Sequence, residues 1–140
     1  MKLTQLLKPW QIEESECTIK NIKNDSRLIE PGDLFIAYPG EKTDGRLYIS
    51  KAVSAGAVAV IYEPKDLPND LELPKTVPCV AMSHVAEKLA EIAHRFYANP
   101  SQFLEVIGIT GTNGKTTIAY QLAQAHDLLK QKAAYIGTIG

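Results

Sequence analysis

A glycine-rich segment near the end of the chain carries the residues best suited to chemistry. It follows an apolar run at 103–109 and precedes a helical pattern at 116–132, which is the order of strand, loop and helix in a phosphate-binding site. Glycine lets backbone N–H groups approach a phosphate closely, and the positive end of a helix dipole favours its charge. The candidate nucleotide-binding residues are Gly111, Thr112, Asn113, Gly114, Lys115, Thr116 and Thr117.

Two of these residues have side chains that suit phosphoryl chemistry. Lys115 can bring a positive charge to the outer phosphates, and the hydroxyl of Thr116 can bind Mg2+. The strict P-loop pattern requires glycine at position 109, where this chain has Ile109. We interpret the segment as a variant phosphate loop, because the flanking strand and helix are both predicted.

Composition excludes several classes of protein. The chain has 15 Lys and Arg against 16 Asp and Glu, a net charge of −1, and no basic stripe, so we expect no nucleic-acid polymer as a partner. No signal-peptide core or membrane-length apolar stretch is present, and we expect a cytoplasmic protein without a membrane partner. Cys17 and Cys79 lack metal or redox spacing and predict reduced thiols.

The remainder of the chain alternates strands and helices. Apolar and alternating runs predict strands at 17–23, 34–38, 57–62 and 77–82, and helices at 47–55 and after Ser83, a candidate N-cap. Asn99-Pro100 ends the last of these helices and marks a domain boundary. The fold class is therefore α/β, with a small first domain at 1–100.

Residues 101–140 provide too little chain for a complete nucleotide-binding domain. They contain one β-α-β unit, which ends in an apolar run at 133–139. Two parallel strands cannot cover both of their faces, and nucleotide folds of this type need more strands. We therefore expect a truncated P-loop domain at 101–140, and the rest of the same polypeptide as its partner.

Two separated patterns resemble the Mur ligases of bacterial cell-wall synthesis. The first pattern includes Asp25-Ser26-Arg27, Pro31-Gly32-Asp33-Leu34-Phe35, Asp44-Gly45 and Gly56-Ala57. The second is the glycine-rich loop, preceded by Asn99-Pro100. The resemblance covers nearly the whole chain, and the loop form Thr-Gly-Thr-Asn-Gly-Lys-Thr-Thr is typical of the member that adds the third residue of the peptidoglycan stem.

The resemblance implies an ATP-dependent amide-bond ligase with Mg2+ as cofactor. In the family, a first domain holds the UDP part of the substrate, a second binds ATP, and a third binds the incoming amino acid. The implied substrates are UDP-N-acetylmuramoyl-L-alanyl-D-glutamate and an amino acid, either diaminopimelate or lysine. Lys115 and Thr116 would be the catalytic residues, with Thr116 as the metal ligand. This chain lacks the third domain, so we expect it to be inactive alone.

The family pattern also places a uridine-nucleotide site in the first domain, on Asn24, Ser26, Glu41, Lys42 and Thr43. For Asp25 and Ser26 the alternative is turn chemistry that satisfies local backbone groups. Arg27 could pair with Asp33 or with a phosphate, and we prefer the structural role. Alternatives for the whole chain are a non-catalytic nucleotide-binding module, the following ligase of the same pathway, and another P-loop enzyme such as a kinase.

Overall fold

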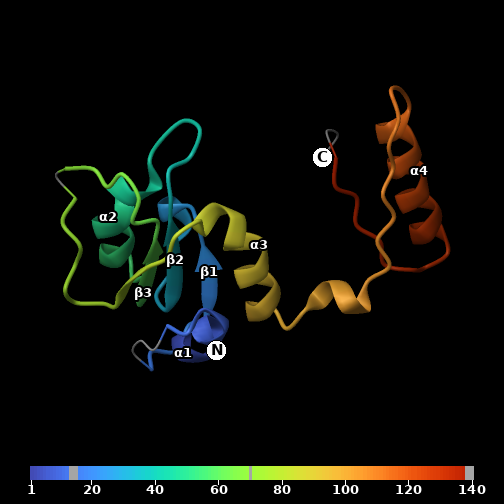
Figure 1. Ribbon diagram of the computed structural model, residues 1–140. Coiled ribbons are helices and arrows are strands. Elements are labelled where there is room, and N and C mark those ends of the chain that lie inside the picture. The colour runs from blue at the N-terminus through green and yellow to red at the C-terminus, as the bar shows by residue number, and fades with distance from the viewer. Residues whose placement is uncertain (13–15, 70, 138–140) are drawn as a thin grey trace. The chain divides into compact units, whose positions relative to one another are not determined.

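The chain forms two compact units, Met1–Phe103 and Leu104–Gly140. Figure 1 shows them in a computed structural model that describes residues 1–12, 16–69 and 71–137. Among these residues, no helix is long and apolar enough to cross a membrane. The mixed α/β class predicted from the sequence is confirmed.

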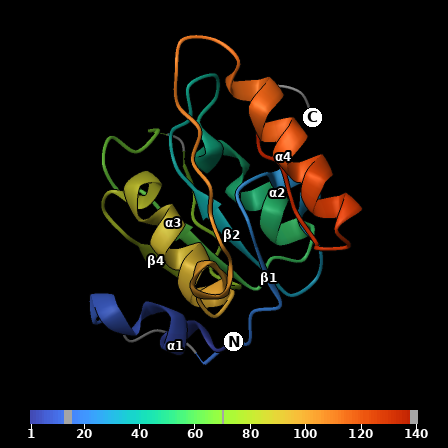
Figure 2. The same cartoon turned by 90° about the vertical axis from the view of Figure 1, so that its right-hand side faces the viewer.

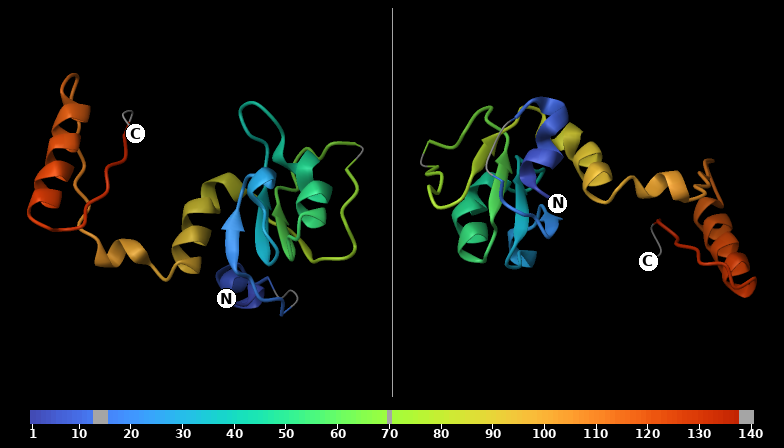
Figure 3. Two further views of the ribbon diagram at one scale, coloured as in Figure 1. Left: turned by 180° about the vertical axis from the view of Figure 1, so that it is seen from behind. Right: turned by 90° about the horizontal axis from the view of Figure 1, so that it is seen from below.

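A four-stranded parallel sheet forms the centre of the first unit. Its strands are β1 (Asn21–Lys23), β2 (Asp33–Ala37), β3 (Ala59–Tyr62) and β4 (Cys79–Ala81), and they lie side by side in that order. Ile22 pairs with Leu34, Phe35 with Val60, and Ile61 with Val80. Because every strand runs in the same direction, all of the carboxyl ends lie at one edge of the sheet (Figure 3).

Helices cover both faces of this sheet. Figure 2 shows α3 (Val85–Phe96) in front of the sheet and α2 (Ile49–Ser54) behind it. The leucines of α1 (Leu3–Leu7) pack in the same apolar cluster as α3. The two central strands are buried along their whole length. Successive side chains alternate between the faces, as the pleat of a strand requires, and a strand covered on both faces reads as a continuous apolar run.

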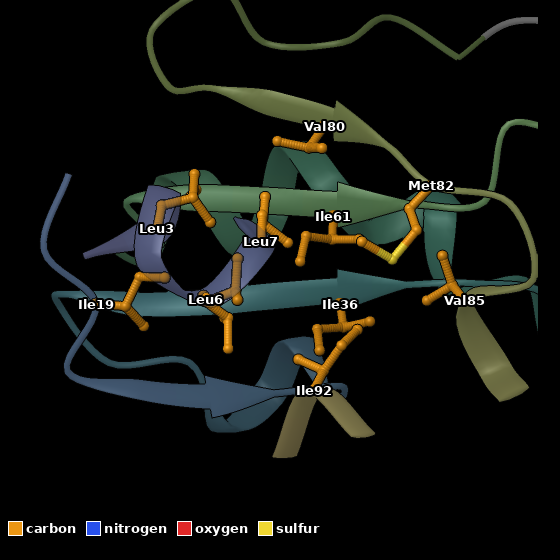
Figure 4. Close-up of a cluster of buried hydrophobic side chains, with 12 residues drawn as sticks. Leu3, Leu6, Leu7, Ile19, Ile36, Ile61, Val80, Met82, Val85 and Ile92 are labelled. Carbon is orange, nitrogen blue, oxygen red and sulfur yellow. The ribbon is translucent and has the colours of Figure 1, made fainter. Parts of the chain in front are cut away.

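The face under α1 and α3 holds the larger of two apolar clusters. Figure 4 shows Leu6 of α1 and Ile92 of α3 packed around Ile36 of β2 and Ile61 of β3, all with at most 1% of their surface exposed. The opposite face packs Phe35 and Val60, among others, against α2. Burial of each such side chain stabilises the unit by about 1.5–3 kcal/mol, so the sheet is a rigid support for the residues at its edges.

Several predicted elements of the first unit have different ends in the structure. The strand expected at 17–23 shortens to β1, with a single antiparallel bridge between Lys2 and Thr18 ahead of it. The helix expected at 47–55 begins as the 3-10 helix η3 (Gly45–Tyr48) and continues as α2. Further 3-10 turns are η1 (Lys8–Trp10), η2 (Ser26–Leu28) and η4 (Pro100–Phe103).

Ser83 is not the N-cap of α3. The cap position is His84, which has a left-handed backbone with φ of 59°. Its side chain makes no capping hydrogen bond, and Oε2 of Glu63 accepts a hydrogen bond of 3.1 Å from Val85 N instead. The cap therefore comes from the residue that follows β3, which sequence spacing alone does not indicate.

The second unit contains α4 (Lys115–Leu128). Between 104 and 137, the described part of this unit, no β-strand is present, so the strands predicted at 103–109 and 133–139 are not formed there; 138 and 139 lie outside the described residues. A strand needs a hydrogen-bonded neighbour, and an isolated pair is marginal in water. The helix ends before the predicted 132 because Lys130 adopts φ of 58° and donates to the carbonyl of Asp127.

Candidate functional site

The carboxyl ends of β1 and β2 bring together the residues predicted to bind a uridine nucleotide. Asn24 follows β1 directly, and the loop 39–44 follows β2. Nδ2 of Asn24 donates a hydrogen bond of 3.2 Å to the hydroxyl of Tyr38, at the base of this loop. We call this set, Asn24, Ser26 and residues 41–43, the substrate edge. In open parallel sheets, ligands bind outside the carboxyl ends of the strands.

The loop of the substrate edge is closed at its base by backbone hydrogen bonds. Gly40 N donates to the carbonyl of Thr43 at 3.0 Å, and Gly45 N donates to the carbonyl of Tyr38 at 3.0 Å. A Cβ at Gly45 would lie 2.9 Å from that carbonyl oxygen, so a side chain here would force the backbone apart. The side chains of Glu41, Lys42 and Thr43 are exposed at the tip, where a ligand can reach them.

Asp25 performs the turn chemistry that was the alternative prediction. It is the N-cap of η2 and accepts a hydrogen bond of 2.9 Å from Arg27 N. Its carboxylate also accepts from the Arg27 guanidinium, with the shortest contact 2.7 Å. The side-chain hydrogen bonds from Arg27, followed by the backbone one, lower the pKa of Asp25 to about 2. Arg27 is thus paired with Asp25 and not with Asp33. Ser26, which separates the two in sequence, is buried.

Sequence reasoning missed Arg46, which lies at the same edge. Its side chain is 3% exposed, and it pairs with Asp44 at 2.7 Å. The hydrogen bonds from Arg46 lower the pKa of Asp44. Asp44-Gly45-Arg46 repeats the spacing of Asp25-Ser26-Arg27, and each Asp caps a 3-10 helix. This repetition of the Asp-x-Arg pattern is the signal that could have identified Arg46.

Glu63 extends the edge beyond β3. Burial favours the protonated acid, but hydrogen bonds from the backbone N–H groups of Val85, Lys65 and His84 outweigh it and lower the pKa of Glu63. The carboxylate therefore neutralises the positive end of α3. This helix N-terminus is already capped by the chain's own anion.

In the second unit, the glycine-rich loop has the backbone geometry of an anion site. Gly111 has φ of 148° and Gly114 has φ of 76°, values that side-chain-bearing residues rarely adopt. Gly114 is the N-cap of α4, so the free N–H groups of the first turn face the loop. Such a helix N-terminus favours bound anions such as phosphate.

Lys115 is exposed at the first position of α4, and its ammonium folds back toward the loop. Nζ donates to the carbonyl of Gly111 and, at 3.4 Å, to the carbonyl of Thr112. Thr116 is half-buried beside it, while Thr112, Asn113 and Thr117 are exposed. The structure thus brings the predicted residues of 111–117 into one loop and helix start.

A divalent cation would have few ligands from this chain. Across the described residues, no group of three or more His, Cys, Asp or Glu side chains could hold a metal ion. A hydroxyl at the start of α4 fits Mg2+ that is held mainly by phosphate oxygens, which is how this ion is bound beside nucleotides. Thr116, the second residue of α4, has the hydroxyl that would serve as this ligand.

Comparison with known proteins defines the class of protein. The Mur ligase family, catalytic domain, matches residues 18–97, and the chain belongs to this family. The matched region includes the substrate edge. The glycine-rich loop lies beyond residue 97, but it is included in the alignments with relatives that match the whole chain.

These relatives share one name. A UDP-N-acetylmuramoyl-L-alanyl-D-glutamate–2,6-diaminopimelate ligase of Pseudomonas aeruginosa is 42% identical over 143 residues, which cover 100% of this chain and 28% of the relative. The ligase of the same name from Pseudomonas putida is 47% identical over 122 residues, which cover 87% of this chain and 24% of the relative. The chain therefore spans about a quarter of the length of the curated relatives it matches.

Solved structures of Mur ligases are also similar to this chain. One with the same ligase name has a TM-score of 0.66 at 28% identity and covers 100% of this chain and 28% of that chain. The MurF ligase of Thermotoga maritima in complex with ADP has a TM-score of 0.57 at 26% identity, and the match covers 82% of this chain and 25% of that chain.

Proposed function

We propose that this chain supplies the uridine-nucleotide site and the phosphate loop of an ATP-dependent ligase, which adds 2,6-diaminopimelate to UDP-N-acetylmuramoyl-L-alanyl-D-glutamate. The observation that carries the proposal is the 42% identity with the Pseudomonas aeruginosa ligase along the whole chain. Residues 1–100 would form the substrate domain, and 101–140 the start of the ATP-binding domain.

The substrate edge would hold the uridine diphosphate. Uracil presents both a donor and acceptors, and the amide of Asn24 and the hydroxyl of Ser26 can match either kind of group. In the loop, the backbone N–H of Glu41 and the side chains of Lys42 and Thr43 would donate to diphosphate oxygens. A ligand site built on the ends of packed strands loses little freedom on binding, which favours affinity.

The glycine-rich loop would hold ATP and Mg2+. ATP supplies the phosphoryl group that makes a substrate carboxylate a better electrophile. Backbone N–H groups of 111–115 would bind its phosphate oxygens, and the ammonium of Lys115 would move from the Gly111 carbonyl to the outer phosphates. Thr116 would ligate Mg2+. Phosphoryl transfer depends mainly on such positioning and charge neutralisation, and the ADP complex of the Thermotoga relative supports this assignment.

The relatives support diaminopimelate as the added group. The curated relatives at 42% and 47% identity are diaminopimelate ligases. A solved relative at 27% identity is a D-alanyl-D-alanyl ligase of Acinetobacter baumannii, the enzyme type that would act next. Among the solved structures the two enzyme types are equally similar to this chain, at 28% and 27% identity, so the diaminopimelate reaction is proposed on the curated relatives alone.

A hybrid enzyme tests the part of the proposal that concerns this chain, namely the uridine-nucleotide site and the phosphate loop. Residues 1–140 would replace the matched segment of the Pseudomonas aeruginosa ligase, with that ligase as the positive control. We expect ATP-dependent addition of diaminopimelate to UDP-N-acetylmuramoyl-L-alanyl-D-glutamate, measured by product mass and phosphate release. A folded hybrid that binds diaminopimelate but neither binds the UDP substrate nor releases phosphate would refute the proposal.

A further inference from the structure

The guanidinium of Arg46 is held inside the first unit by a complete set of acceptors. Its side chain is 3% exposed. On one side it donates two hydrogen bonds to the carboxylate of Asp44, from Nε to Oδ1 at 3.0 Å and from Nη2 to Oδ2 at 2.7 Å. A paired, parallel contact of this kind is the strongest that an arginine makes with a carboxylate.

On its other side, Arg46 reaches the segment that follows β3. Nη1 donates to the carbonyls of Glu63 at 3.0 Å and Lys65 at 2.5 Å, and Nη2 donates to the carbonyl of Asp66 at 2.9 Å. Asp66 has a left-handed backbone with φ of 49°, and the hydrogen bond from Arg46 to its carbonyl stabilises this turn. With Nε on Asp44, every N–H group of the guanidinium has an acceptor.

Asp44 connects this network to the substrate edge. It forms an antiparallel bridge with Pro39, which closes the loop containing Glu41, Lys42 and Thr43. Its carboxylate also accepts from Arg46 N at 2.9 Å as the N-cap of η3. Through Asp44 and Arg46, the end of the loop that follows β2 is connected to residues 63–66, which follow β3.

We propose that Arg46, acting through Asp44, is a positioning residue that holds the loop of the substrate edge in the conformation that binds the uridine diphosphate. The inference rests on the proposed function, because it takes the uridine nucleotide as the ligand. Arg46 does not bind the ligand itself, since its donors are occupied and it is buried. Its effect is on affinity, because a loop that must be ordered on binding loses affinity for the ligand.

The test is Arg46→Lys, which keeps the charge but loses the planar fork of donors. In the 140-residue chain, we expect affinity for UDP-N-acetylglucosamine to fall at least about tenfold, a factor equal to 1.4 kcal/mol, with affinity for ATP and Mg2+ within about twofold. In the hybrid ligase, KM for the UDP substrate should rise while kcat stays within about twofold.

A matched control separates positioning from general destabilisation. Arg95 donates to the carbonyls of Leu6 and Gln5, where α3 meets α1. Arg95→Lys removes guanidinium-to-carbonyl bonds of the same unit, outside the substrate edge, and should leave UDP-N-acetylglucosamine affinity within about twofold. If Arg46→Lys does not fold, Asp44→Asn serves instead, because it keeps the side-chain shape and removes the charge; a smaller loss of affinity is expected.

Amide hydrogen exchange at Gly40 and Gly45, the donors that close the loop, reports the order of the loop separately from its affinity for the ligand. Faster exchange together with weaker binding in Arg46→Lys supports the inference. Unchanged affinity in a folded Arg46→Lys chain overturns it. Failure of the unaltered chain to bind UDP-N-acetylglucosamine would instead refute the proposed substrate, and exchange at Gly40 and Gly45 would then still decide whether Arg46 holds the loop.

Discussion

The two candidate sites owe their shapes to different physical causes. The substrate edge lies at the end of a sheet whose central strands are buried on both faces, and its loop is tied down by Arg46. The glycine-rich loop has its shape from the backbone of Gly111 and Gly114 and from the first turn of α4. Apolar side chains of its unit, such as Leu128 and Ile136, are 84% and 98% exposed.

The difference shows that a site can be organised by packing or by local backbone chemistry. A substrate edge organised by packing should respond to core substitutions and to loss of long-range hydrogen bonds. A loop organised locally should keep its shape without a packed core and respond to its own residues.

The largest effect is expected for Lys115→Ala in the hybrid ligase. Turnover should fall at least about 100-fold, because a charge that meets the transferring phosphoryl group acts most strongly in the transition state. The affinity for the UDP substrate should stay within about twofold, as measured by equilibrium binding. Thr116→Ala should also reduce turnover and be partly restored by raised Mg2+, because its proposed role is metal ligation.

Lys132→Ala is the matched control for Lys115→Ala. Lys132 is an exposed lysine of the same unit, beyond the end of α4, and its removal should leave turnover unchanged. Near-normal turnover of Lys115→Ala would show that the glycine-rich loop has only a structural role.

Substitution of an apolar side chain should lower the free energy of unfolding much more in the first unit than in the second. Ile61→Ala empties part of the cluster in Figure 4, where Ile61 is fully buried, and should lower the free energy of unfolding of the first unit by about 2–5 kcal/mol. Leu128→Ala removes an 84% exposed side chain and should change stability by less than about 0.5 kcal/mol. Urea unfolding of the 140-residue chain, followed by circular dichroism, measures both. Equal losses would show that the apolar surface of the second unit is covered in solution.

The smallest effect concerns pH and the exposed Asp-x-Arg pair. The carboxyl resonance of Asp25 should titrate with a midpoint of about 2, and in Arg27→Gln the midpoint should move toward the ordinary value of about 3.9. Because the pKa is lower in the folded state, this carboxylate contributes stability above about pH 4 that is lost as the pH falls toward 2. A midpoint near 3.9 in the unaltered chain would show that the pair does not persist in solution.

The sequence predicted the parts of this structure that depend on local pattern. Apolar runs located β2 and β3, because strands covered on both faces are continuously apolar. The glycines of the loop identified the start of α4, because positive φ angles need glycine. Residues 103–109 have the same apolar character as a buried strand, but a strand also needs a neighbour, and sequence pattern alone cannot supply one.

The missed parts depend on contacts between distant residues. Glu63 caps α3 from 22 positions away, and Arg46 bonds to carbonyls 17 to 20 positions away. Neither contact has a fixed spacing in sequence, so pattern reasoning favoured Ser83 as the cap and could not predict which carbonyls Arg46 binds, although the Asp-x-Arg pattern marks Arg46 itself. Asn24 and the loop after β2 could be grouped only through the family resemblance, whereas the parallel sheet gives the physical reason for their proximity.

The most direct test of the central claim is a titration of the 140-residue chain with two ligands, followed by backbone amide NMR. With ATP and Mg2+, we expect shifts at residues 111–117; with UDP-N-acetylglucosamine added to the ATP-saturated chain, we expect new shifts at Asn24, Ser26 and residues 41–43. Two separate sets of shifts would support two sites, one that binds ATP and one that binds the uridine nucleotide. Shifts from UDP-N-acetylglucosamine confined to 111–117, or no second set, would contradict the account.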